Sequence, residues 1–544
     1  MRELTAAPVE PNCAAPWRVL AVLCIGAFAI LMDTTTVNVA VPSLVDGLHA
    51  GLDDVLWVYN AYLLLFGALL VLMSRLGDIY GQRRLFVLGL VVFALSSAVC
   101  GAAQAPGELI AARAVQGLGA AMLAPQPLVI ISATLPPERR GAALGVYNSM
   151  IALAAVIGPT LGGVLVSYVG WRWIFYVNLP VTACGTALAV RVLPDLRLGR
   201  RHRLDVTGVV LATLGLAALV FGLVEGQRYS WGKVTGAPVT VPEVMTAGAV
   251  LLAAFCLWQR SRRNREPLLP GTLFADRTVM LLCALPGCAQ FALASIMVLG
   301  AVNLQSVLGY SAVVSGLTSL PLTVGIATLA PLAGRLSDRT GSKPVLICGF
   351  TLCALGILAV IAVLSVHATP FSFIWPYILV GLGTGCLFAP LTTEALRRVP
   401  QELTGALAGV LNTSRQFGSA IGSAVVGGVL AAILASEMRT KAVAVAGQLR
   451  GRARASFLHG FAHLDQTGLE VGRGQSGGAT VPATVPQPLR DRLEQVVHTI
   501  FTTSYVHAMR VALVIPAVLL VACAVSCLVL ARPRRATFAP AEVL

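Results

Sequence analysis

The chain has 544 residues, of which 57% are hydrophobic and only 12% are charged. Because soluble domains carry roughly 25% charged residues, this composition excludes an ordinary cytosolic enzyme. Hydrophobic runs recur from Trp17 to Ala531, so the sequence leaves no room for a soluble half. The formal net charge of +15 could suggest a nucleic-acid surface, but the placement of the basic residues argues against one. The composition predicts an all-α polytopic membrane protein.

Fourteen stretches are long and apolar enough to cross a membrane as helices, which requires about 20 residues each. In chain order they are 17–42, 55–74, 85–105, 109–133, 143–168, 173–193, 206–225, 239–258, 279–302, 311–333, 344–366, 373–395, 406–434 and 509–531. The first stretch is too long for a signal-peptide core and no basic cluster precedes it, so no cleaved targeting segment is expected.

Basic residues are concentrated in one of the two alternating sets of connections between these stretches. That set includes both ends of the chain and contains Arg75, Arg83, Arg84, Arg139, Arg140, Arg335, Arg339, Lys343, Arg397, Arg398 and the clusters at 197–203, 260–265 and 532–535. The short connections of the other set contain only Arg172, Arg228 and Lys233. Basic residues accumulate on the cytoplasmic side, so we expect both termini in the cytoplasm and no nucleic-acid partner. The arginine and alanine bias is typical of bacteria, which indicates a bacterial cytoplasmic membrane.

Two internal repeats relate the first half of the chain to the second. Five residues recur 264 positions later: Gly141, Gly145, Asn148, Gly158 and Gly163 match Gly405, Gly409, Asn412, Gly422 and Gly427. The segment 74–84 recurs 260 positions later and aligns Asp78 with Asp338. Parallel halves of six helices are a transporter architecture, in which one half rocks against the other. The predicted organisation is an N-terminal tail (1–16), a first six-helix half (17–193), an inserted two-helix region (194–277) and a second half (278–544) with an outer loop at about 435–508.

Four motifs fall on these predicted helices and loops. They are Asp33-Thr-Thr-Thr-Val-Asn38-Val-Ala-Val-Pro42, the loop at 74–84, Arg113-Ala-Val-Gln116-Gly-Leu-Gly119, and Gly158-Pro159-Thr-Leu-Gly162-Gly163. Together they resemble the major facilitator superfamily, and within it the fourteen-helix drug:proton antiporters of the EmrB/QacA type. The loop departs from the family pattern at Ser74 and Gln82. The resemblance implies the major facilitator fold, and its Gly-Pro element is associated with antiporters.

Asp33 and Arg113 are expected to lie in the outer half of the membrane, where a salt bridge between them is geometrically feasible. Charges at such depth face the bundle interior or a cavity and usually serve a function. Burial and a neighbouring arginine act on a carboxyl group in opposite directions, so its proton affinity can change as access alternates. We therefore predict that Asp33 carries a coupled proton and that Arg113 tunes its affinity. The alternative is a static pair that fixes helix packing.

Two other motifs predict conformational switches. Gly158 and Gly162 share one helix face and Pro159 loosens the helix there, so the element 158–163, with Gly163, is expected at a moving interface between the halves. Ordinary helix packing is the alternative. In the loop, Gly81 permits a turn, and Asp78 caps a helix or pairs with Arg83 or Arg84. We interpret this loop as a latch that is repeated at Asp338. The alternative is that the basic residues of the loop only satisfy the cytoplasmic bias of positive charge.

Further polar residues are candidates for a substrate cavity: Asn38, Tyr62, Gln126, Gln305 and Arg415. Arg415 has no obvious acidic partner, because Glu394 lies at the cytoplasmic end of the predicted helix 373–395, away from Arg415. The cavity is therefore not predominantly acidic, and anionic, zwitterionic or neutral lipophilic substrates are as plausible as cations. The alternative for Arg415 is a structural side chain bonded to backbone carbonyls.

No enzyme is predicted. The chain lacks a G-x-x-x-x-G-K-[ST] loop for ATP, and no catalytic or metal constellation is visible. We expect no cofactor and a cycle driven by the proton gradient, with lipophilic small molecules, protons and membrane lipid as partners. The predicted function is proton-coupled export of lipophilic drugs or toxic metabolites. A dedicated exporter of one metabolite, antibiotic or lipid, and a proton-coupled importer, remain alternatives.

Overall fold

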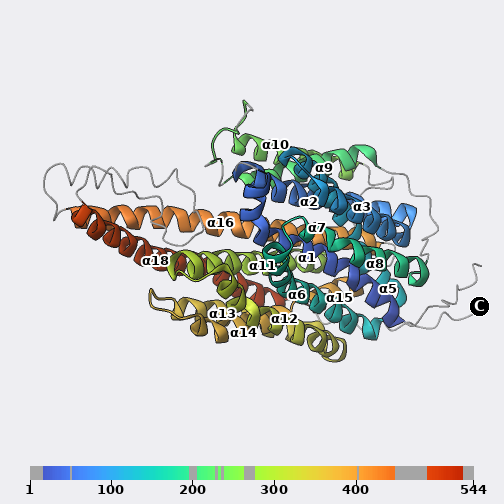
Figure 1. Ribbon diagram of the computed structural model, residues 1–544. Helices are drawn as coiled ribbons and strands as arrows, with labels where there is room; N and C mark the ends of the chain where they lie inside the picture. The colour runs from blue at the N-terminus through green and yellow to red at the C-terminus, as the bar shows by residue number, and fades with distance from the viewer. Residues whose placement is uncertain are drawn as a thin grey trace, which may run out of the picture.

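The protein is a bundle of long helices (Figure 1). The computed structural model describes residues 16–48, 52–194, 205–226, 229, 231–234, 238–261, 276–400, 403–446 and 487–530. Thirteen helical segments are long and apolar enough to cross a membrane, and a shorter apolar helix covers Thr207–Leu223. Each predicted span coincides with one of these segments, and the chain is an all-α polytopic membrane protein.

The first half contains six membrane-crossing segments. They are formed by α1 (Pro16–Leu48), α2 (Leu52–Tyr80), α3 (Gln82–Ala102), α4 (Pro106–Leu123) with α5 (Gln126–Thr134), α6 (Pro137–Tyr168), and α7 (Trp173–Tyr176) with α8 (Asn178–Val192). The fourth segment is interrupted between α4 and α5. Pro125 and Pro127 have no backbone N–H to donate, which explains the interruption.

The second half repeats this plan after two inserted helices. The inserted helices are α9 (Val206–Glu225) and α10 (Val241–Ser261). The second half consists of α11 (Arg277–Val302) with η2 (Asn303–Val307), α12 (Ala312–Thr340), α13 (Ser342–Val363), η3 (Pro370–Phe373) with α14 (Ile374–Gly385) and α15 (Phe388–Arg398), α16 (Thr404–Ala446) and α18 (Gln487–Leu528).

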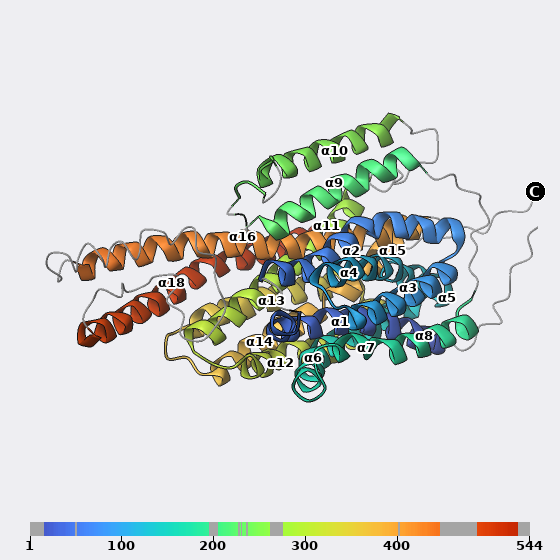
Figure 2. The ribbon, with the colours of Figure 1, turned by 45° about the horizontal axis from the view of Figure 1, so that its top comes forward.

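The inserted pair lies along one side of the bundle (Figure 2). Asp205 caps α9 by accepting a hydrogen bond from the Gly208 N–H at 3.1 Å. The same carboxylate accepts hydrogen bonds from the side chains of Trp258 at 3.1 Å and Gln259 at 2.9 Å, both on α10. One buried carboxylate thus fastens the two inserted helices to each other.

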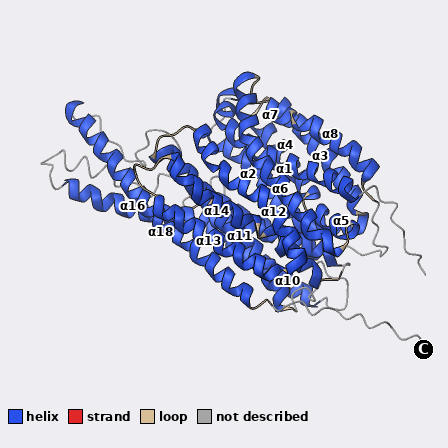
Figure 3. Cartoon of the chain, turned by 90° about the horizontal axis from the view of Figure 1, so that it is seen from below, coloured by secondary structure: helices blue, strands red, loops and turns tan. Residues whose placement is uncertain are grey.

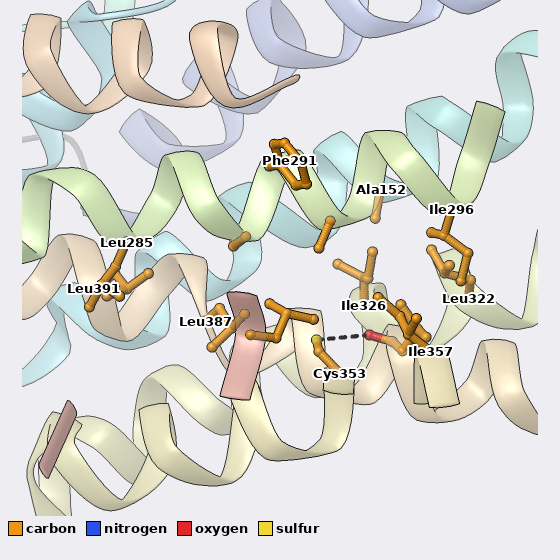
Figure 4. Close-up of a cluster of buried hydrophobic side chains, with 14 of the residues drawn as sticks. Ala152, Leu285, Phe291, Ile296, Leu322, Ile326, Cys353, Ile357, Leu387 and Leu391 are labelled. Carbon is orange, nitrogen blue, oxygen red and sulfur yellow. Dashed lines mark hydrogen bonds between the residues drawn. The ribbon is translucent and has the colours of Figure 1, made fainter. Parts of the chain in front are cut away.

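Duplication is visible in the backbone as well as in the sequence. Gly81 joins α2 to α3 with φ 97°, and Gly341 joins α12 to α13 with φ 90°. This left-handed region disfavours side chains, which explains glycine at both positions. Apolar side chains of several helices form a shared core, and Figure 4 shows Ala152 of the first half near Ile326 and other side chains of the second.

One end of the bundle carries the α2–α3, α5–α6, α12–α13 and α15–α16 connections. They lie together because the end of α2 contacts the start of α16 and the end of α12 contacts the start of α6. We call this end the arginine-rich end, after Arg75, Arg83, Arg84, Arg139, Arg140, Arg335, Arg339, Arg397 and Arg398.

Two helices are much longer than predicted. With 43 and 42 residues, α16 and α18 each measure roughly 64 Å, about twice the thickness of a hydrocarbon core. They project together beyond the other helices (Figure 3). The expected outer loop at 435–508 is therefore wrong in extent, since helix continues to Ala446 and resumes at Gln487. Residues 447–486 lie outside the described residues.

Candidate functional site

Asp33 and Arg113 form the predicted ion pair inside the first half. Asp33 lies on α1 and Arg113 on α4, and both side chains are completely buried. The Nη1 atom of Arg113 lies 2.6 Å from Oδ2 of Asp33. Since a lone charge at this depth is costly, each residue provides the other's counter-charge.

Two amide side chains complete the coordination of the Asp33 carboxylate. Gln116 on α4 donates to Oδ1 at 2.9 Å, and Asn178 at the start of α8 donates to the same atom at 2.8 Å. Both amides also donate to the hydroxyl of Ser97 on α3, at 2.9 and 3.0 Å. The carboxylate is thus held by three N–H donors, an arrangement suited to an ionised group that only accepts hydrogen bonds.

Arg113 is positioned by α2 as well as by the carboxylate. Its Nε donates to the carbonyl of Val58 at 3.2 Å, and its Nη1 also donates to Gln116 at 2.6 Å. The guanidinium lies 4.3 Å from the centre of the Tyr62 ring, a cation–π contact. Within the described part of the chain, its Nη2 has no hydrogen-bond partner. We call Asp33, Arg113, Gln116, Asn178, Ser97 and Tyr62 the Asp33 cluster.

This cluster corrects one prediction and adds residues that the sequence did not single out. Tyr62 was expected in the substrate cavity, but it is completely buried against Arg113. Gln116 follows Arg113 by three residues, a spacing that places both side chains on one helix face, so the motif itself contained this signal. Asn178 and Ser97 come from distant helices, and no sequence signal links them to Asp33.

Gly158 and Gly162 pack against α1, next to Asp33. A Cβ atom at Gly158 would overlap the hydroxyl of Thr35, and one at Gly162 would lie 3.1 Å from the Cα of Thr36. Both contacts are within the first half. The expectation that this pair lies at the interface between the two halves is therefore wrong. The sequence shows a small helix face but not the helix that covers it. Gly163 is also on α6, and the side chain of Pro159 lies outside the described residues.

The interface between the halves uses the beginning of α6 instead. A Cβ at Gly145 would overlap the carbonyl oxygen of Ala330 on α12. The hydroxyl of Ser149 donates to the carbonyl of Ala327 at 2.6 Å. These backbone approaches hold α6 and α12 together in the portion near the arginine-rich end.

Asp78 lies where α2 meets the start of α16. A Cβ at Gly405 would overlap its carboxylate, and the hydroxyl of Ser74 donates to the carbonyl of Gly405. Within the first half, Asp78 accepts a hydrogen bond from Gln82 at 3.2 Å. An ion pair with Arg75 measures 3.9 Å.

The expected pairing of Asp78 with Arg83 or Arg84 is wrong. Arg83 instead donates to the carbonyl of Val190 on α8, and Arg84 is exposed. Both arginines follow the positive-φ turn at Gly81 and lie in the first turn of α3.

Asp338 makes a further hydrogen-bonded contact between the halves. Its carboxylate accepts hydrogen bonds from the N–H groups of Gly141 at 3.3 Å and Ala142 at 3.1 Å, in the first turns of α6. Arg397 lies 3.4 Å away. The helix dipole favours a negative charge near this end of α6. Asp78 and Asp338 therefore occupy equivalent positions, each against the helix of the opposite half.

The remaining cavity candidates separate into different environments. Gln126 is completely buried and donates to the carbonyl of Met73 on α2 at 3.2 Å, so it packs between helices and does not line a cavity. Gln305 is half-buried in η2. The side chain of Asn38 lies outside the described residues. Arg415 on α16 contacts Thr392 and Phe388 of α15. Glu394, its nearest sequence candidate for a partner, binds Arg398 at 2.9 Å instead.

Comparison with known proteins relates most of the chain to one family. The family model described as Major Facilitator Superfamily matches residues 23–423. The puromycin resistance protein pur8 of Streptomyces alboniger is 38% identical over 431 residues, covering 77% of this chain and 84% of that protein. The multidrug resistance protein Stp of Mycobacterium tuberculosis is 35% identical over 398 residues, covering 73% and 72%.

A solved structure shares the fold at low sequence identity. The crystal structure of the human organic anion transporter MFSD10 superposes with a TM-score of 0.58 and 14% identity, covering 93% of this chain and 100% of that one.

Proposed function

The chain belongs to the major facilitator superfamily, whose members are membrane transporters and not enzymes, and on that premise we propose that it is a proton-coupled antiporter. It exports lipophilic small molecules, drugs or toxic metabolites, across a bacterial cytoplasmic membrane by alternating access. Both termini face the cytoplasm, and the proton gradient drives the cycle without a cofactor. The observation that carries this proposal is the completely buried, fully coordinated carboxylate of Asp33.

Asp33 binds the coupled proton. A protonated carboxyl group donates through one oxygen, so at least one of the three N–H contacts is released when Asp33 is loaded. If the ion pair opens, Arg113 loses its counter-charge at a depth where an unpaired charge costs at least about 2.5 kcal/mol. Proton binding and release therefore change the preferred arrangement of α1 and α4.

The helix contacts provide a route from this carboxyl group to the interface. Thr35 and Thr36 follow Asp33 on α1 and pack on Gly158 and Gly162 of α6. The same helix α6 reaches the second half through Gly145. A displacement of α1 is thus transmitted to the helix that joins the halves, and this is the role we propose for the Gly-Pro element.

Asp78 and Asp338 act as latches in this mechanism. The arginine-rich end is the cytoplasmic end, because basic residues accumulate on that side. With both contacts made, the halves are joined there, and we interpret this arrangement as the outward-facing state. Export requires both latches to open so that the cavity reaches the cytoplasm, and to close again before the substrate leaves outward.

The substrate class is supported by the relatives. One is named for resistance to puromycin and another for multidrug resistance. Broad export of lipophilic drugs is therefore the first proposal. The name of pur8, which refers to a single antibiotic, favours a dedicated exporter as the second candidate.

Efflux from energised cells tests this function. Cells that produce the protein are loaded with ethidium, Nile red or pyrenebutyrate, and with puromycin as the single-antibiotic probe, with and without a protonophore. We expect outward transport of at least one fluorescent compound, abolished by the protonophore. Transport of puromycin alone would favour the dedicated exporter. No transport despite confirmed surface expression would contradict both, and protonophore-insensitive transport would contradict proton coupling.

A further inference from the structure

Arg415 is a cation inside the second half that has no acidic partner. It lies eleven residues after the start of α16, roughly 16 Å along the helix and thus well inside the membrane. Its Nη2 is 3.4 Å from the hydroxyl of Thr392, a long and weak contact. Its guanidinium lies 4.5 Å from the centre of the Phe388 ring, and its Nε has no hydrogen-bond partner among the residues that the structure describes.

The described part of the chain offers no acid to neutralise this charge. Asp33 is paired with Arg113 in the first half. Glu394 is paired with Arg398, and Asp338 with Arg397, both at the arginine-rich end. A charge at this depth in the membrane without a counter-charge is unfavourable, so a residue that only stabilises helix packing would not be expected here.

The internal repeat shows that the shared packing of the two halves does not require a cation. The offset of 264 that aligns α6 with α16 places Ile151 at the position equivalent to Arg415. Conversely, α11 contains no acidic residue to match Asp33 of α1. The first half thus holds a neutral ion pair, and the second half holds an unneutralised positive charge.

The helix that carries Arg415, α16, contacts α2 and α5 of the first half as well as α15 of the second. The Arg415 partners Thr392 and Phe388 lie on α15, and Tyr147 lies on α6 of the first half, which packs against α15. Arg415 and Tyr147 are both half-buried, although they lie on helices at the centre of the bundle. A cation with an unsatisfied N–H and an aromatic neighbour is therefore found on a helix that contacts both halves.

We propose that Arg415 recognises an anionic group of the substrate, and that the transported compounds carry a carboxylate on an aromatic body. A guanidinium offers paired N–H donors in a planar fork that matches a carboxylate. The rings of Phe388 and Tyr147 pack against the aromatic body. Substrate binding then neutralises the buried charge. This inference deepens the proposed function and rests on it.

Binding to the purified full chain in zwitterionic nanodiscs tests this proposal independently of transport. The probes are pyrenebutyrate, pyrenebutanamide and pyrenebutylamine, which share one aromatic body and are anionic, neutral and cationic. Fluorescence titration is performed on the wild type, Arg415→Gln, Arg415→Lys and the control Arg172→Gln, which removes a cation outside the central interface. Each titration is made in a buffer whose anion is gluconate and is repeated with chloride as the buffer anion.

We expect the wild type to bind the acid at least 10-fold more tightly than the amide, because a charge-assisted hydrogen bond is replaced by a neutral one. Arg415→Gln should abolish this difference, Arg415→Lys should retain part of it, and Arg172→Gln should leave it unchanged. If Arg415→Gln weakens all three probes equally, Arg415 is structural and the proposal is overturned. Tighter binding of the amine than of the acid would also overturn the proposal. So would the loss of the preference for the acid over the amide when chloride is the buffer anion. Export of ethidium in cells would leave the proposed function standing while the charge class failed.

Discussion

Replacing Gly145 with alanine should open the arginine-rich end of the protein. The new Cβ would overlap the carbonyl oxygen of Ala330 and lie 2.6 Å from the Cα of Pro331. Both neighbours are backbone atoms, which cannot rotate away. Overpacking of this kind costs about 1 to 3 kcal/mol, which corresponds to roughly a 5- to 150-fold change in the balance between access states. Alanine favours helix over glycine, so a loss of helix propensity cannot produce the effect.

Two other glycines provide graded controls for this substitution. The repeat aligns Gly145 with Gly409, where a Cβ would lie 3.1 Å from the side chain of Ser74, a milder approach. At Gly316 a Cβ would meet nothing within 4 Å. The assay is hydrogen–deuterium exchange in nanodiscs, followed at the start of α6 and the end of α12. Exchange should increase most for Gly145→Ala, less for Gly409→Ala and not for Gly316→Ala. Equal exchange in all three variants would refute the interpretation of this contact as a closed interface.

Three further substitutions test other parts of the structure. Asn178→Ala removes one of the three N–H donors to the Asp33 carboxylate, so efflux driven by the proton gradient should fall by roughly 2- to 10-fold; unchanged efflux would contradict the assigned contact. Asp338→Ala removes the acceptor of the Gly141 and Ala142 N–H groups and should speed hydrogen exchange at the start of α6, whereas unchanged exchange would exclude a latch. Asp205→Ala should destabilise the α9–α10 pair by about 2 kcal/mol and lower the thermal unfolding midpoint, while an unchanged midpoint would mean that the cap is not needed.

Hydrophobicity and duplication were sufficient to predict most of the architecture. Each of the fourteen spans was recognisable because lipid requires a continuous apolar helix. The outer ends of α16 and α18 were not recognisable by this criterion. There, polar residues such as Lys441 alternate with buried ones such as Val497, Ile500 and Phe501, and the two helices cover each other's apolar faces. That pattern is amphipathic, so a search for uniformly apolar stretches ends too early.

The candidate site was predicted unevenly, for a related reason. Asp33 and Arg113 were found because charges in apolar helices are rare and need a counter-charge. Asn178 was not found, because a polar amide at a helix start is common and only the fold brings it to Asp33. Gly158 showed a face made for close packing, yet its partner, Thr35 of α1, depends on tertiary arrangement.

Transport by reconstituted Asp33→Asn tests most directly whether Asp33 carries the coupled proton. Asparagine keeps the shape of the side chain but has no carboxyl group that could bind and release a proton. Proteoliposomes are assayed twice, for substrate accumulation driven by a pH gradient and for exchange of substrate across the membrane without a gradient. If Asp33 carries the proton, the variant loses gradient-driven accumulation and retains exchange. Accumulation that remains fully dependent on the pH gradient in Asp33→Asn would contradict it.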